Sequence, residues 1–152
     1  MTYFDTAYVL KCYVQEPGSE QVRAFARGCE RLACSVYGRL ELHAALHRKL
    51  REGRLAERDL DVVLRQLSVD ESVGLWEWLP LTARVRAAVA DVYRKLSRDV
   101  FLRTGDAVHL LSAREHGLTE ICSNDRHLLE AAPHVGMKGR DVIQRADTVE
   151  GS

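Results

Sequence analysis

The sequence lacks any apolar run of the roughly 18 residues that a membrane-spanning helix needs. Its first residues, MTYFDTAYVLKCYV, contain an acid and no basic segment of the kind that begins a secretory signal. We therefore expect neither membrane insertion nor export, and we expect the protein in the cytoplasm.

Cysteine and proline are scarce, at four and three residues of 152. No C-x-x-C pair occurs among the cysteines, which are Cys12, Cys29, Cys34 and Cys122. A chain of this length can build a core without disulfides, so we expect reduced and mostly buried thiols. Cys29 and Cys34 with His43 and His47 do not have the spacing of a zinc site, and the histidines fit a helix surface better.

An excess of charge of one sign is also missing, because 22 Lys and Arg balance 22 Asp and Glu. Nucleic-acid-binding domains often have an isoelectric point above about 9. The charge is nevertheless uneven: residues 23–58 contain nine basic and four acidic side chains, and residues 99–152 contain six basic and nine acidic ones. A polyanionic partner would therefore have to be bound by a local group of cations.

Several catalytic signatures are absent. There is no G-x-x-x-x-G-K-[ST] or G-x-G-x-x-G loop to bind a nucleotide, and no G-x-S-x-G of a serine hydrolase. A phosphatase with an aspartyl nucleophile needs a second aspartate two residues after the first, but Ala7 follows Asp5 at that distance. These enzyme classes are excluded.

The composition is that of a folded protein, with 46% hydrophobic and 29% charged residues. No linker, repeat or low-complexity segment divides the chain. We expect one domain over residues 1–145, followed by a short tail at 146–152.

Short apolar segments alternate with amphipathic ones along the chain. The pattern predicts strands at residues 3–4, 32–34, within 71–79, and at 120–122. It predicts helices at residues 6–14, 19–28 with Ser19 as its cap, 35–53, 56–67, 82–98, 104–116 and 125–132. Because parallel strands need crossover connections, this alternation predicts an α/β fold with a parallel sheet between helices.

Four acids fall where such folds bind ligands, beyond the carboxyl ends of the strands. Asp5 directly follows the first strand and Asp125 follows the fourth, while Asp106 lies in the first turn of a helix and Glu41 in the helix after the second strand. Grouped carboxylates are unfavourable unless a cation neutralises them, and an all-oxygen ligand set suits Mg²⁺ or Mn²⁺. A metal site is therefore one explanation of the pattern.

Each acid also has a purely structural explanation. Asp106 can complement a helix dipole, and Asp125 can cap a helix. Glu41 can lie on a solvent-facing stripe of its helix. Asp5 is the most suggestive of the four, because it stands between an apolar strand and an apolar helix.

Four segments in order resemble a PIN domain of the VapC toxin type, and the resemblance extends from Thr2 to about Val142. The segments are Tyr3-Phe4-Asp5-Thr6-Ala7 with Glu16-Pro17-Gly18-Ser19-Glu20, then Leu40-Glu41-Leu42, then Leu102-Arg103-Thr104-Gly105-Asp106-Ala107-Val108-His109-Leu110, and Ser123-Asn124-Asp125-Arg126-His127-Leu128-Leu129. The resemblance implies a three-layer α/β/α sandwich with a parallel sheet of about four or five strands.

The same resemblance implies an endoribonuclease that depends on Mg²⁺ or Mn²⁺ and acts as the toxin of a type II toxin–antitoxin pair. By position, Asp5, Glu41 and Asp106 match the core acidic triad of the family, and Asp125 matches its fourth acid, whether for a second metal ion or for orienting water. Thr6 and Ser123 match hydroxyl positions beside the acids. The family also implies a homodimer and an antitoxin whose basic side chain enters the acidic pocket. Thr104-Gly105 departs from the bulkier pair of the family.

RNA is bound mainly through its phosphates, for which arginine and lysine are the usual ligands. Arg103 and Arg126 stand beside the acidic motifs, and the basic segment adds Arg39, Arg48, Lys49, Arg51 and Arg54. A solvated helix face explains the latter equally well. Single strands are the expected substrate, because duplex grooves hide the bases. Tyr8, Tyr37 and Trp76 could stack on bases, although core packing is the better explanation of each.

One alternative from another class stays open. A catalytically inactive PIN-like module that only binds RNA or a protein fits the neutral charge and the acidic C-terminal segment. Such a module would keep its affinity without divalent metal and would tolerate Asp5→Asn.

Overall fold

The computed structural model describes residues 1–143, which form one parallel sheet of five strands in the order β3-β2-β1-β4-β5. The strands are β1 (Thr2–Phe4), β2 (Leu32–Ser35), β3 (Trp76–Leu79), β4 (Glu120–Cys122) and β5 (Lys138–Arg140). The central strand is β1, in which Tyr3 is paired with Ala33 on one side and Ile121 on the other.

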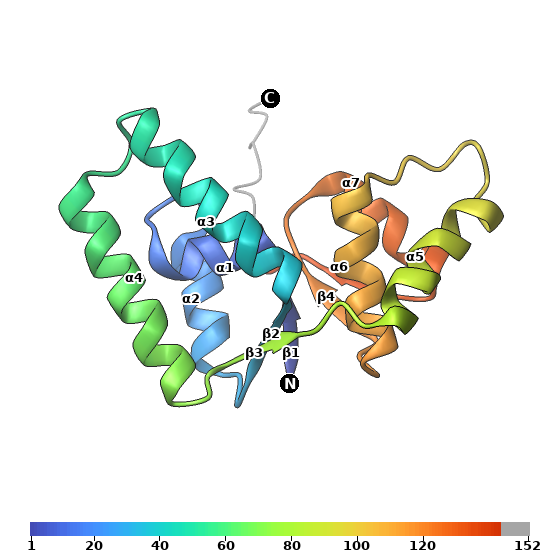
Figure 1. Ribbon diagram of the computed structural model, residues 1–152, viewed down its shortest axis with the longest axis horizontal. Coiled ribbons are helices and arrows are strands. Elements are labelled where there is room, and N and C mark those ends of the chain that lie inside the picture. Colours follow the sequence, from blue (N-terminus) through green and yellow to red (C-terminus); the bar gives the residue numbers. More distant parts are fainter. Residues whose placement is uncertain (144–152) are drawn as a thin grey trace, which may run out of the picture.

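Seven helices in the described residues connect the strands. They are α1 (Thr6–Tyr13), α2 (Ser19–Arg27), α3 (Val36–Arg51), α4 (Glu57–Ser72), α5 (Ala83–Lys95), α6 (Thr104–Glu115) and α7 (Arg126–Ala131), followed by the 3₁₀ turn η1 (Ala132–Val135). Figure 1 shows α1 to α4 on one side of the sheet and α5 to α7 on the other. The predicted α/β/α sandwich is therefore confirmed, with the larger of the two expected strand numbers.

The core forms around Tyr3 and Phe4 of β1, which are large and buried on opposite faces of the sheet. Tyr3 and Phe4 have no exposed surface. Phe4 packs edge-on against Tyr8 and Trp76 and stacks with Phe25. Such aromatic pairs add about 0.5–1.5 kcal/mol each to the effect of burial alone.

Two predicted helix ends are wrong. Helix α4 continues to Ser72 instead of ending near residue 67, so β3 is restricted to Trp76–Leu79. The last turn of α4 is stabilised because Glu71 binds both Arg39 of α3 and the indole of Trp78. Helix α5 ends at Lys95 and not near residue 98, because Leu96 takes an extended conformation.

Strand β5 has no counterpart in the sequence prediction. Its residues, Lys138–Arg140, show neither an apolar run nor an alternating pattern. They become a strand by pairing with Glu120–Cys122 of β4 at the edge of the sheet. Gly139 permits the close approach of α7, since a Cβ there would lie 2.7 Å from Leu129 Cδ2.

The predicted cap of α2 is also wrong by one residue. Gly18, with φ +85°, occupies the N-cap position, and Ser19 is the first helical residue. The buried Ser19 hydroxyl accepts a hydrogen bond from the Glu16 backbone N–H and donates one to the Val14 carbonyl. Ser19 therefore fixes the turn between α1 and α2.

All four cysteines are unpaired, and Cys34 and Cys122 are buried, as expected. His43 and His47 are exposed on α3, and residues 1–143 contain no group of three or more His, Cys, Asp or Glu side chains arranged to hold a metal ion. Within the same residues no helix is long and apolar enough to cross a membrane. The predicted domain boundary at residue 145 lies outside the described residues.

Candidate active site

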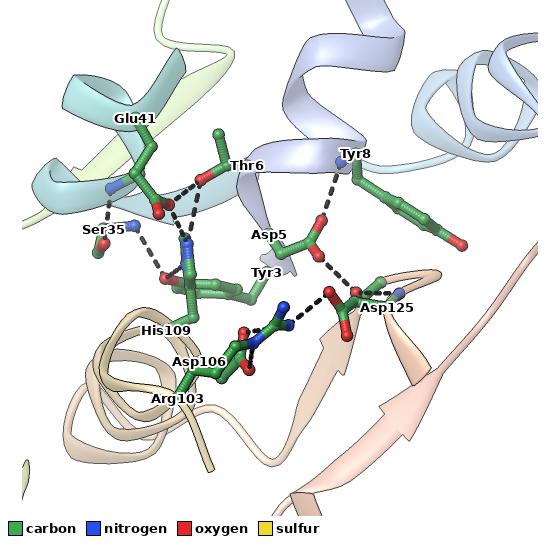
Figure 2. A network of polar contacts seen from close by, with 12 residues as sticks. Tyr3, Asp5, Thr6, Tyr8, Ser35, Glu41, Arg103, Asp106, His109 and Asp125 are labelled. Carbon is green, nitrogen blue, oxygen red and sulfur yellow. Dashed lines mark hydrogen bonds and ion pairs between the residues drawn. The ribbon is translucent and has the colours of Figure 1, made fainter. Parts of the chain in front are cut away.

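A pocket of about 640 Å³ lies at the carboxyl ends of the central strands, between α1 and α3 on one side and α6 and α7 on the other. All four predicted acids line it: Asp5, Glu41, Asp106 and Asp125. They come from four separate segments of the chain. Figure 2 shows their side chains directed toward a common region.

Asp5 is held at the floor of the pocket and has only 4% of its surface exposed. Its Oδ1 accepts a hydrogen bond of 2.9 Å from the Tyr8 backbone N–H, so it caps α1. Its Oδ2 accepts a hydrogen bond from the Ser123 hydroxyl. Burial raises the pKa of Asp5, although the bond from Ser123 acts in the opposite direction.

Glu41 is part of a hydrogen-bonded cluster that reaches into the core. Its Oε2 accepts hydrogen bonds from the Thr6 hydroxyl and, at 2.8 Å, from His109 Nε2. On the other side of the ring, His109 Nδ1 is 2.9 Å from the Tyr3 hydroxyl, which accepts a hydrogen bond from the Ser35 backbone N–H. The orientation of Glu41 is therefore fixed by groups from β1, α1 and α6 (Figure 2).

The same cluster shifts two pKa values. Burial alone would raise the pKa of Glu41, but the hydrogen bonds from His109 and Thr6 outweigh it and lower that pKa. Burial alone would lower the pKa of His109, but Tyr3, Cys34 and Glu41 outweigh it and raise that pKa well above its usual value. A charged His109 beside an ionised Glu41 is the combination that these shifts favour.

Two glycines make room for the cluster. A Cβ on Gly38 would lie 2.4 Å from Cys34 Sγ and 2.8 Å from His109 Cε1, so only glycine lets the first turn of α3 pass the imidazole. A Cβ on Gly105 would lie 3.3 Å from Tyr37 Oη and 3.4 Å from Glu41 Oε1. Gly105 therefore leaves space for the side chains of α3, and α6 begins at Thr104.

Arg103 connects the two remaining acids. Its guanidinium donates to both carboxylate oxygens of Asp106, at 2.7 and 3.2 Å, and to Asp125 Oδ2 at 2.6 Å. This contact lowers the pKa of Asp125, against the effect of burial. Asp125 also caps α7 by accepting hydrogen bonds from the backbone N–H groups of His127 and Leu128.

The donor set fits a hard divalent cation. Four carboxylates face Arg103 and His109 in this part of the pocket, and oxygen ligands suit Mg²⁺ or Mn²⁺. Within the described residues the carboxylates are not arranged as a set of metal ligands. Instead, each is bound by a neighbouring side chain: Asp5 by Ser123, Glu41 by His109, and Asp106 and Asp125 by Arg103. Arg103 therefore competes with a cation for Asp106 and Asp125.

The other predicted site residues have different surroundings. Thr6 lines the pocket and binds Glu41, whereas Ser123 is buried behind Asp5. Arg103 lines the pocket, but Arg126 does not and instead pairs with Glu130 on the surface of α7. Tyr37 lines the pocket, while the other aromatic candidates, Tyr8 and Trp76, are buried in the core.

Sequence reasoning assigned no role to His109 and Tyr3. The available signal for His109 was its position in the otherwise apolar segment from Ala107 to Leu111, three residues after Asp106, which places both on one face of α6. Tyr3 gave no such signal, because a tyrosine in a buried strand is ordinary.

Comparison with known proteins gives a family match and one relative with substantial identity. The model of the PIN domain family matches residues 2–133. The chain is 30% identical over 142 residues to ribonuclease VapC46 of Mycobacterium tuberculosis, a match that covers 89% of this chain and 92% of that protein.

Solved structures of distant sequence share the fold. The crystal structure of FitAcB from Neisseria gonorrhoeae matches with a TM-score of 0.72 at 16% identity, covering 93% of this chain and 98% of that one. A toxin–antitoxin complex from Klebsiella pneumoniae matches with a TM-score of 0.57 at 9% identity, covering 88% of this chain and 94% of that one.

Proposed function

The chain belongs to the PIN domain family, and on that premise we propose that it is a metal-dependent endoribonuclease that hydrolyses RNA phosphodiester bonds. One observation carries the proposal: four carboxylates from separate segments line one part of a single pocket, where Arg103 contacts two of them and His109 a third. A relative with 30% identity over most of the chain is named a ribonuclease, which supports RNA as the substrate.

Asp5, Glu41, Asp106 and Asp125 would hold Mg²⁺ or Mn²⁺. When bound, such an ion neutralises negative charge on the phosphate and lowers the pKa of a water molecule, so that hydroxide is available near neutral pH. Thr6 and His109 orient Glu41, and Ser123 orients Asp5, as outer partners of metal ligands commonly do. Arg103, once released from the carboxylates, can donate two hydrogen bonds to a phosphate.

The test is cleavage of a mixed RNA pool by the purified protein with Mn²⁺ or Mg²⁺, with EDTA, and by the Asp5→Asn variant. We expect cleavage only with metal, and a loss of at least about 100-fold in Asp5→Asn, because even outer partners of metal ligands cost 10–100-fold. Asparagine can still cap α1, so the variant should keep the melting temperature of the parent within a few degrees.

The outcome also separates the enzyme from the binding module that the sequence leaves open. RNA that is retained but not cut, with the same affinity in EDTA and in Asp5→Asn, would favour the module and exclude the nuclease. Cleavage that survives EDTA would exclude the metal-dependent mechanism.

We propose further that the protein is the toxin of a toxin–antitoxin pair and forms a homodimer. The Klebsiella pneumoniae complex of similar fold supports the first part, since its own name states such a pair. Light scattering on the purified protein, alone and with the product of a neighbouring small gene, measures both associations. A monomer that binds no such product would contradict this part of the proposal.

A further inference from the structure

The pocket continues beyond the acids along α3. Its lining includes Glu41, Ala44, Ala45 and Arg48, which are spaced i, i+3, i+4 and i+7 and so share one face of the helix. Arg48 is two turns from Glu41, or roughly 10 Å along the helix axis. Two successive phosphates of one strand can therefore occupy the two positions.

The wall between the two positions carries no charge among the residues that line it. The side chains there are small or apolar: Ala7 and Leu10 of α1 and Ala44 and Ala45 of α3. The pocket therefore has an acidic end and an end at Arg48.

The end at Arg48 has the opposite charge balance. Glu16 lines the pocket there and is bound by Lys11, with 3.1 Å between Lys11 Nζ and Glu16 Oε2, and by Lys49. Lys11 and Lys49 have only 7% and 9% of their surface exposed, so their charges are directed at Glu16 and not at a ligand. Arg48 has no carboxylate within ion-pair distance among residues 1–143, and its side chain is exposed.

We propose that Arg48 binds a second phosphate of the RNA, so that a single strand lies along α3 from the acids to this arginine. The inference rests on the proposed function, since it requires RNA in the pocket. A chain of phosphates suits both ends, because a cation can link one phosphate to the acids while Arg48 binds another.

The test compares Arg48→Ala with Arg51→Ala. Arg51 is the matched control because it is also exposed on α3, also has no ion pair within residues 1–143, and does not line the pocket. Both variants should fold normally, which thermal unfolding verifies. The first measurement is cleavage of a fluorescent single-stranded RNA over a range of concentrations and salt.

We expect Arg48→Ala to raise KM about tenfold and to leave kcat within about twofold, as the loss of a charged hydrogen bond to substrate would. The slope of log KM against log salt should fall by about 0.7, the value for one phosphate contact to a single strand. Arg51→Ala should leave both quantities within about twofold of the parent. Equal effects of the two variants, or a fall in kcat with KM unchanged, would overturn the proposal.

A binding measurement keeps this test independent of catalysis. In the Asp5→Asn background, fluorescence anisotropy should give about tenfold weaker RNA binding with Arg48→Ala and no change with Arg51→Ala. If the parent does not cleave RNA but this difference is found, the nuclease proposal fails and the phosphate site stands. If the parent cleaves RNA and the difference is missing, the phosphate site fails alone; if RNA is neither cleaved nor bound, both fail.

Discussion

At one end of the pocket four carboxylates face Arg103 and His109. At the other end one carboxylate is bound by two lysines, beside Arg48, which has no ion pair within residues 1–143. Both ends contain acidic and basic side chains, and the chain as a whole has no net charge. The difference lies in the local ratio of anions to cations. The acidic end suits a cation and the basic end suits a phosphate, so overall neutrality says little about binding.

Among changes at the acidic end of the pocket, substitution of His109, which orients Glu41, should have the largest effect on metal binding. We expect His109→Phe to weaken Mn²⁺ binding and RNA cleavage 10–100-fold, as the loss of such outer partners commonly does, because the Glu41 carboxylate and the Tyr3 hydroxyl both lose a partner. Isothermal titration with Mn²⁺ and steady-state kinetics measure the two effects.

His109→Gln provides the control for that change, since its amide can donate to Glu41. Partial recovery of Mn²⁺ affinity in His109→Gln, but not in His109→Phe, would identify positioning of Glu41 as the role. Equal losses in both, together with a lower melting temperature, would mean that His109 acts only in the core.

A smaller effect is expected when Arg103 is removed. This change makes the acidic end of the pocket more negative and so increases its difference from the end at Arg48. Arg103→Ala leaves Asp106 and Asp125 without their cation, so the protein should be less stable without metal and should bind Mn²⁺ several-fold more tightly. Thermal unfolding with and without Mn²⁺ tests both statements.

Arg126→Ala is the matched control, because Arg126 pairs with Glu130 outside the pocket. It should leave Mn²⁺ affinity unchanged. Unchanged or weaker Mn²⁺ binding in Arg103→Ala would show that this arginine does not compete with the metal.

The smallest expected effect is that of Glu16→Gln on the free energy of unfolding. Burial alone would raise the pKa of Glu16, but Lys49 and Lys11 outweigh it and lower the pKa below its usual 4.5. A carboxyl whose pKa is lowered on folding stabilises the protein above the unfolded pKa, and this stabilisation is lost as the pH falls through the folded pKa. Glu16→Gln should therefore cost about 1 kcal/mol at pH 7 and less at progressively lower pH.

Urea unfolding at pH 7 and at several points below pH 4.5 measures this difference. Glu30→Gln, at an exposed loop position, is the control and should leave the stability at pH 7 unchanged. A constant difference between Glu16→Gln and the parent at all pH values would contradict the assignment of the ion pairs.

The helices and strands that carry strong local signals could be predicted from the sequence. The apolar start of β1, the long amphipathic α3 and the glycine stop after α6 lie where the pattern indicates. Strand β5 and the last turn of α4 could not be predicted, because β5 depends on pairing with β4 and the end of α4 on Arg39 and Trp78. Contacts between distant segments leave no local pattern.

The sequence by itself predicted that Asp5 and Asp125 lie together, because each follows a strand and parallel strands end at one edge of the sheet. The family resemblance added Glu41 and Asp106 to this group. Only the tertiary structure decided what surrounds them. It placed His109 of α6 against Glu41 of α3, Arg103 between Asp106 and Asp125, and Arg48 at the far end of the same pocket. The physical reason is that charge and hydrogen bonding act over a few ångströms in space, whatever the separation along the chain.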